Sequence, residues 1–187
     1  MNKAFFSLPD HDRDIGLECY SLANWKGIEF SSSEKLSSLQ YVDVSLAHEA
    51  MKIREVTPDL DHVTVRSSIY GVRSANASSP LTIKDSSISG NVFAVISDNA
   101  SSPLTIRDCI ISDNVFVGIQ IKDRSKGLTI ENTVVSNTIK GHGLSYNLDA
   151  DPVNFCSDEV ENMTSFPIFF EALGKPRTTG DCAKVGN

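Results

Sequence analysis

The sequence predicts an all-β fold in which short strands stack in successive parallel coils. The first observation is a repeat: NASSPLTIKDSSISGNVFAVI, which begins at Asn76, returns at Asn99 as NASSPLTIRDCIISDNVFVGI. The second is strict alternation of apolar and polar residues within each copy, rich in Ile, Val and Thr, which is typical of strands. Repeats of this length are usually structural units that bury their apolar face by stacking on one another.

The repeat length distinguishes a stacked coil from a propeller blade. The motif Leu-Thr-Ile begins at Leu81, Leu104 and Leu128, so the spacings are 23 and 24 residues. A propeller blade needs about 40 residues, whereas a coil stacks on its neighbour at a strand spacing of about 4.8 Å. We therefore expect an inward-facing stack of Leu81, Ile83, Ile88, Leu104, Ile106, Ile111, Leu128 and Ile130.

The alternation extends over most of the chain and sets the expected domain limits. Earlier, less regular coils are predicted at 25–30, 39–47 and 60–72. We expect a leader at 1–14, a parallel β-helix at 15–150 and a Cys-containing, non-repeating tail at 151–187. Because the end of a solenoid must be covered, the tail is interpreted as a cap or as the start of a linker.

An asparagine recurs after the first strand of each repeat, at Asn91, Asn114 and Asn137. Stacked side-chain amides can hydrogen-bond along the inside of a coil, which leaves no buried amide unpaired. The pattern thus predicts an asparagine ladder. A shifted alignment of the third repeat places Thr138, rather than Asn137, opposite Asn114.

The cysteines and glycosylation sequons bear on the cellular compartment. The four cysteines are too widely spaced for a CxxC metal site, and Cys109 replaces Ser86 of the preceding repeat, which predicts a small buried side chain. Cys156 and Cys182 lie in the tail, where a disulfide would stabilise most; the alternative is two free thiols. The Asn-x-Ser/Thr sequons are Asn76, Asn99 and Asn162. Together these features favour an extracellular protein.

Composition excludes some classes of partner. A net charge of −7 argues against nucleic acid, because no basic face is available to neutralise phosphates. The apolar runs are too short for direct membrane insertion, and the first residues do not form a convincing signal peptide. The expected partners are other proteins at cell–cell contacts, with glycans as a further possibility.

The order of three motifs, WKGIEF, SSLQYVDVSLA and SPLTIKDSSISGN, resembles right-handed parallel β-helix repeats. Combined with the tail FCSDEVENMTSFPIFFEALGKPRTTGDCAKV, it is similar to the extracellular β-helix modules of bark beetle (Anakonda) proteins. The resemblance implies a role at epithelial tricellular junctions within a large transmembrane protein. Since the chain shows neither a transmembrane helix nor a cysteine-rich domain, it would be a fragment, a truncated gene model or a short relative.

β-Helices also carry polysaccharide lyases and hydrolases, so an enzyme is the second class of function to consider. Gly141-His142-Gly143 resembles one polygalacturonase motif, but the paired carboxylates that supply acid and base are missing around it. His142 is therefore interpreted as a turn residue between glycines. The run DHDRD at 10–14 is interpreted as a solvated terminal segment.

A charged edge is the second candidate for chemistry. Asp85, Asp108 and Glu131/Asn132 fall at equivalent coil positions, with Lys84 and Arg107 beside the aspartates. Calcium-dependent lyases use such carboxylates with a nearby base. We instead expect an open stripe in which these charges satisfy each other between coils.

The sequence as a whole indicates a non-catalytic extracellular β-helix module for cell–cell adhesion or junction organisation, on the outer face of the plasma membrane. The alternatives are a carbohydrate-active β-helix enzyme and an intracellular β-helix protein that only binds a partner. We expect no catalytic residue, no bound metal and no cofactor. Fold alone does not decide between these functions.

Overall fold

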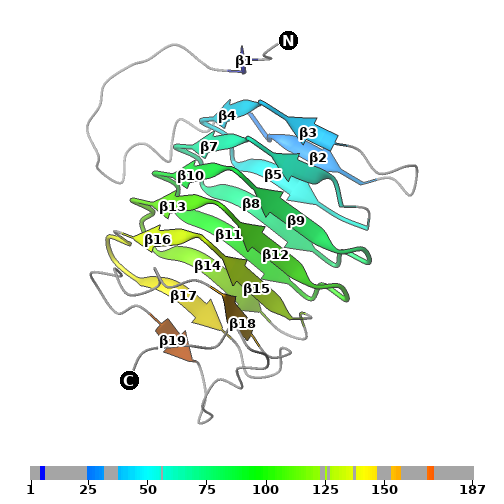
Figure 1. Ribbon diagram of the computed structural model, residues 1–187. Helices are drawn as coiled ribbons and strands as arrows, with labels where there is room; N and C mark the ends of the chain where they lie inside the picture. Colours follow the sequence, from blue (N-terminus) through cyan, green and yellow to red (C-terminus); the bar gives the residue numbers. More distant parts are fainter. Residues whose placement is uncertain are drawn as a thin grey trace.

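The computed structural model describes residues 5–6, 25–31, 38–55, 57–122, 125, 127–136, 138–146, 153–156 and 168–170. Within these ranges every regular element is a β-strand, and the strands stack in successive coils along a solenoid (Figure 1). Among the same residues, no helix is long and apolar enough to cross a membrane. The predicted all-β solenoid is confirmed.

Three sheets run the length of the solenoid, and each coil contributes one strand to each of them. Sheet 1 contains, in spatial order, β1 (Phe5–Phe6), β4 (Asp43–Ser45), β7 (Thr64–Arg66), β10 (Ser87–Ser89), β13 (Ile110–Ser112) and β16 (Val134–Ser136). Sheet 2 contains β19 (Ile168–Phe170), β17 (His142–Tyr146), β14 (Val117–Lys122), β11 (Phe93–Asp98), β8 (Tyr70–Ala75), β5 (Glu49–Ile53) and β2 (Ile28–Phe30). Sheet 3 contains β18 (Val153–Cys156), β15 (Leu128–Glu131), β12 (Leu104–Arg107), β9 (Leu81–Lys84), β6 (Asp59–Asp61) and β3 (Ser38–Gln40).

All strand pairs in these sheets are parallel, and equivalent residues of consecutive coils lie side by side. In sheet 3, Leu81 pairs with Leu104, which pairs in turn with Leu128. The eight residues of the expected inward stack are all buried, with at most 2% of their surface exposed. Because burying one Leu or Ile side chain contributes about 1.5–3 kcal/mol, this stack is a major source of stability.

The chain turns sharply between sheet 3 and sheet 1 through one residue with positive φ in each coil. The residues at this position, with φ between 44° and 55°, are Tyr41, His62, Asp85, Asp108 and Asn132. Asp and Asn tolerate this left-handed conformation better than most residues. We call this column of residues, with the strand-end residues that precede them, the charged corner.

Strands continue beyond the limits that the alternation indicates. β18 pairs with β15, and β19 pairs with β17, so two sheets extend past residue 150 into the region expected to be a non-repeating tail. At the other end, β1 pairs with β4 and lies within the expected leader. The strands after residue 150 were missed because their sequence lacks the period-two pattern of the central repeats.

Candidate functional site

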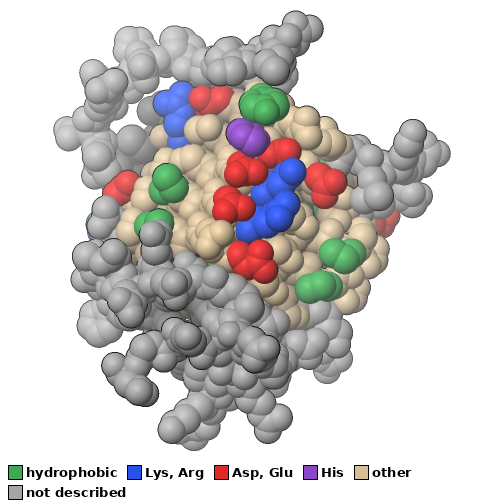
Figure 2. All heavy atoms as spheres, in the orientation of Figure 1, with side chains coloured by type: hydrophobic (Ala, Val, Ile, Leu, Met, Phe, Trp, Pro, Cys, Tyr) green, Lys and Arg blue, Asp and Glu red, His purple; other side chains and the backbone are tan. Residues whose placement is uncertain are grey.

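The charged corner lies on one open face of the solenoid (Figure 2). Register places Asp61, Lys84, Arg107 and Glu131 beside one another across sheet 3. In Figure 2 the basic side chains form a short central group flanked by acidic ones, with a histidine at one end. The surface is thus mixed in charge.

The pairing within the charged corner differs from the one expected. Lys84 Nζ lies 3.0 Å from Asp61 Oδ2, on the preceding coil, so Lys84 is paired with neither Asp85 nor Asp108. Asp108 instead accepts a hydrogen bond from Asn132 Nδ2 at 3.3 Å. Lys84 is matched to a charge on a neighbouring coil, but to Asp61, which lies outside the central repeats. Among the described residues, Asp85, Arg107 and Asp108 form no ion pair, so the expected matching of these charges to one another is not present.

Asp61 is buried despite its charge, with 8% of its surface exposed. Burial acts to raise the pKa of Asp61, but hydrogen bonds and favourable charge interactions with Lys84 and His62 outweigh it, so the pKa lies below its ordinary value. Gln40 Nε2 also donates to Asp61 Oδ2 at 3.3 Å. Asp61 therefore stays ionised at neutral pH.

Asp61, His62 and Asp85 form a cluster with metal-ligand chemistry, which the sequence analysis did not identify. One ligand atom from each residue lies within 4.8 Å of the others. In the sequence, only the dipeptide Asp61-His62 hinted at a metal site. Its proximity to Asp85 follows from the register between coils, which the sequence does not show.

A second charged network lies on sheet 2, and the sequence analysis missed it as well. Arg73 on β8 contacts Glu49 on β5 at 2.8 Å and Asp98 on β11 at 3.2 Å, so it links three consecutive coils. Lys52 Nζ lies 2.6 Å from the other Glu49 oxygen. Burial acts to raise the pKa of Glu49, but Lys52 and Arg73 together lower it below its ordinary value.

A column of rings runs beside this network along the solenoid axis. The Tyr70 and Phe93 rings are stacked with centroids 5.3 Å apart, and Phe93 and Phe116 are stacked at 5.8 Å. His48 extends the column at its other end, 5.9 Å from Tyr70. The Arg73 guanidinium lies 5.4 Å from the centre of the Tyr70 ring, within cation–π range.

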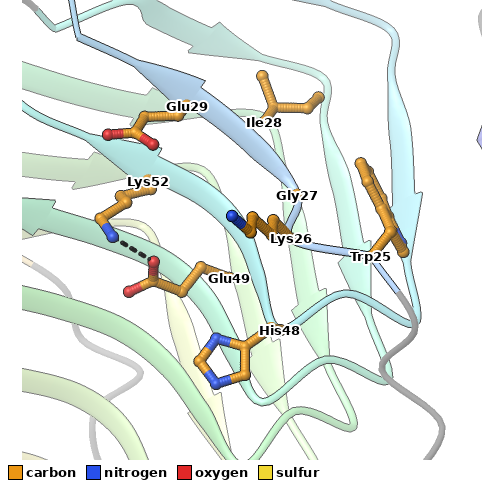
Figure 3. Close-up of a pocket in the computed structure, with 8 residues that line it drawn as sticks. All are labelled: Trp25, Lys26, Gly27, Ile28, Glu29, His48, Glu49 and Lys52. Carbon is orange, nitrogen blue, oxygen red and sulfur yellow. Dashed lines mark ion pairs between the residues drawn. The ribbon is translucent and has the colours of Figure 1, made fainter.

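A cavity of about 630 Å³ opens next to this network at the β2 end of sheet 2 (Figure 3). Its lining residues are Trp25, Lys26, Gly27, Ile28, Glu29, His48, Glu49 and Lys52. Figure 3 shows the Lys26, Glu29, Glu49 and Lys52 side chains gathered on one side of β2 and β5. A Cβ at Gly27 would lie 1.6 Å from the Glu49 carbonyl oxygen, so only glycine permits this close approach.

His142 begins β17 and pairs in register with Val117 of β14. A Cβ at Gly141 would lie 1.9 Å from the Phe116 carbonyl oxygen, and a Cβ at Gly118 would lie 2.6 Å from the Gly143 carbonyl oxygen. Gly141 thus lies where two coils approach closely, and the Gly143 carbonyl is approached by Gly118 of the neighbouring coil. Packing between coils accounts for the first glycine of the motif.

The asparagine ladder is present for the residues that the structure describes. Asn114 Oδ1 accepts hydrogen bonds from the Asn91 backbone N–H at 2.9 Å and from Asn91 Nδ2 at 3.3 Å. Ser68 extends the ladder, because its backbone N–H donates to Asn91 Oδ1. Asn137 lies outside the described residues, and Ile139 N donates to the Asn114 carbonyl, which places Thr138 at the next position.

The remaining expected sites are placed only in part. Asn76 and Asn99 are exposed on consecutive coils, and Asn99 Nδ2 donates to Asn76 Oδ1 at 2.7 Å. Cys109 is a buried free thiol, as predicted, and its burial raises its pKa to about 11. Asn162, Cys182 and the 10–14 run lie outside the described residues. Glycosylation and the Cys156–Cys182 disulfide therefore stay predictions.

Comparison with known proteins agrees with the architecture. A family model described as "Right handed beta helix region" matches residues 23–169, well over half of the chain. Searches of curated proteins and of solved structures returned no match. The match concerns β-helix repeats in general, and no homologue supports the narrower resemblance to bark beetle modules. The chain belongs to the right-handed β-helix family.

Proposed function

We propose that this protein is a non-catalytic β-helix module that binds a partner at its surface. The observation that carries the proposal is the pairing of buried carboxylates with cations of neighbouring coils, Asp61 with Lys84 and Glu49 with Arg73. These pairs fix the position of charged groups on two faces of a rigid solenoid. Fixed, complementary charges favour selective binding of one partner over others.

The pKa values of the two carboxylates support binding over proton transfer. The pKa of Glu49 and the pKa of Asp61 both lie below their ordinary values. A general acid at neutral pH needs a raised pKa, and a carboxylate with a lowered pKa is a weak general base. Both groups are therefore better suited to hold charge than to exchange protons.

The partner class follows from the extracellular features of the sequence. We propose a protein at cell–cell contacts, with a glycan as the alternative ligand, and a location on the outer face of the plasma membrane within a larger protein. Deleting this module from its parent should abolish the parent's localisation to cell junctions. Unchanged localisation after deletion would contradict the adhesion role.

An enzyme acting on polysaccharides is the rival, and the cavity beside Glu49 is the observation in its favour. The direct test is incubation with pectate, polygalacturonate and related polymers, with and without calcium. We expect no turnover. Turnover that disappears in Glu49→Gln, at the cavity, or in His142→Ala or Asp108→Ala would replace the binding proposal with a catalytic one.

A further inference from the structure

We propose that Asp61, His62 and Asp85 form a binding site for a divalent transition-metal ion such as Zn²⁺ at the charged corner. The two carboxylates and the imidazole come from consecutive coils, and one donor atom of each lies within 4.8 Å of the others. Ligand atoms in tetrahedral zinc sites lie about 2.0–2.2 Å from the ion and therefore about 3.3–3.6 Å from one another. Rotation of the exposed His62 and Asp85 side chains would bring the three donors to that spacing.

Two of these donors, His62 and Asp85, project from the same side of the solenoid. His62 and Asp85 occupy equivalent corner positions, with φ of 51° and 49°, so their side chains leave the backbone in the same direction. The Tyr41 ring, on the coil before His62, lies 4.7 Å from the imidazole. Tyr41 therefore supports the imidazole on the side opposite Asp85, which reduces the ordering needed for binding.

Asp61 supplies the third donor and the contact that orients the imidazole. Its Oδ2 contacts Lys84, while its Oδ1 lies 2.5 Å from His62 Nδ1. Without an ion, a hydrogen bond between these two atoms holds the imidazole in place. Because metal binding displaces protons from its ligands, the ion would replace the bridging proton, and the two atoms would move apart to the spacing of about 3.3–3.6 Å that tetrahedral zinc requires.

The charge of the site favours a divalent cation. Asp61 and Asp85 contribute two negative charges, and Lys84 compensates one of them. Among the described residues, no hydrogen bond or ion pair engages the Asp85 carboxylate. The presence of an imidazole beside two oxygens selects zinc-like ions over calcium, which prefers oxygen ligands alone.

The chain offers a closely matched control for this site. Asp108 occupies the same corner position as Asp85 one coil further on, with φ of 53°, but it does not belong to the cluster. Asp85→Asn and Asp108→Asn thus make the same chemical change at equivalent backbone positions. His62→Ala removes the imidazole, and His48→Ala removes an exposed imidazole elsewhere.

Isothermal titration of the chelator-treated full chain with Zn²⁺ tests the proposal. We expect one equivalent to bind, with affinity at least about tenfold weaker in His62→Ala and in Asp85→Asn. Asp108→Asn and His48→Ala should bind as the wild type does. Circular dichroism verifies that each variant is folded.

Cobalt(II) then distinguishes this site from the cysteines. Binding at the cluster should give no intense thiolate charge-transfer absorption. Absence of saturable Zn²⁺ binding, equal affinity in Asp85→Asn and Asp108→Asn, or a thiolate spectrum would each overturn the assignment. Tighter binding of Ca²⁺ than of Zn²⁺ would overturn the role given to His62.

Discussion

Asn114 lies one coil beyond Asn91 inside the solenoid, and the Asn114 amide makes four hydrogen bonds there. Its Oδ1 accepts from the backbone N–H and from Nδ2 of Asn91. Its Nδ2 donates to the backbone carbonyls of Ile88 and Ser112. Since both asparagines are at most 1% exposed, water cannot replace any of these partners.

Asn114→Ala should therefore lower the free energy of unfolding by about 3 kcal/mol, because it leaves buried donors and acceptors unsatisfied. The shift of the urea unfolding midpoint measures this loss. Asn99→Gly is the control, because the Asn99 amide also pairs with an asparagine of the neighbouring coil but is exposed, and glycine tolerates the positive φ of 50° at this position. The control should cost about 0.5 kcal/mol or less. Equal costs for the two variants would contradict a structural role for the buried ladder.

Ile106 is fully buried between Ile83 and Ile130 on the neighbouring coils. Ile106→Asp should unfold the coils around it, because it would bury a charge without a partner. Ile106→Val removes one methylene group and should cost only about 0.5–1.5 kcal/mol. Circular dichroism and limited proteolysis compare the two variants. A folded Ile106→Asp protein with cooperative unfolding would be inconsistent with the stacked core.

The inward face could be predicted from the sequence because its pattern is local. Apolar residues alternate along each strand, and the repeat itself shows which residues are equivalent, as for Ile83 and Ile106. Cys109 was placed correctly by the same logic, since it replaces Ser86 at an equivalent position. In each case the identity of the stacking neighbour follows from the repeat.

The outward face could not be predicted, because its contacts join coils of unequal length. In register, Arg73 pairs with Lys52, 21 residues earlier, and with Ile96, 23 residues later. Its ion pairs with Glu49 and Asp98 run diagonally across the strands. The earlier coil has no clear repeat to fix its register. One residue of slippage would move every outward side chain to a different neighbour. The contact between Lys84 and Asp61 was missed although the two residues are in register, because the coil that carries Asp61 does not show the repeated sequence.

Arg73 and Glu49 should control stability in acid. A carboxylate whose pKa is lowered in the folded protein contributes to stability at pH values above its pKa in the unfolded chain, which for Glu49 is ordinarily 4.5. This contribution is lost as the pH falls through the pKa of the folded protein. Arg73→Gln removes one of the two cations at Glu49, so its pKa should rise. The variant should therefore be less stable than the wild type at neutral pH, and the part of its stability that is lost in acid should be smaller.

Unfolding midpoints measured from neutral to acidic pH check this prediction. Arg66→Gln is the control, because Arg66 also reaches a carboxylate on the preceding coil, Asp43, but its side chain is 53% exposed. Water screens an exposed pair, so this variant should change the acid profile less. An identical shift in both variants would rule out a special role for the buried Glu49.

The variants Gly141→Ala and His142→Ala test whether the Gly-His-Gly motif has a structural or a catalytic role. A Cβ at Gly141 would lie 1.9 Å from the Phe116 carbonyl oxygen, so the backbones of two coils must move apart to accept alanine. Such overpacking should cost about 1–3 kcal/mol, seen as a lower urea midpoint. His142 is only partly buried, and its removal requires no backbone movement, so His142→Ala should cost less. The reverse order of costs would mean that the histidine, rather than the close approach of the coils, explains the motif.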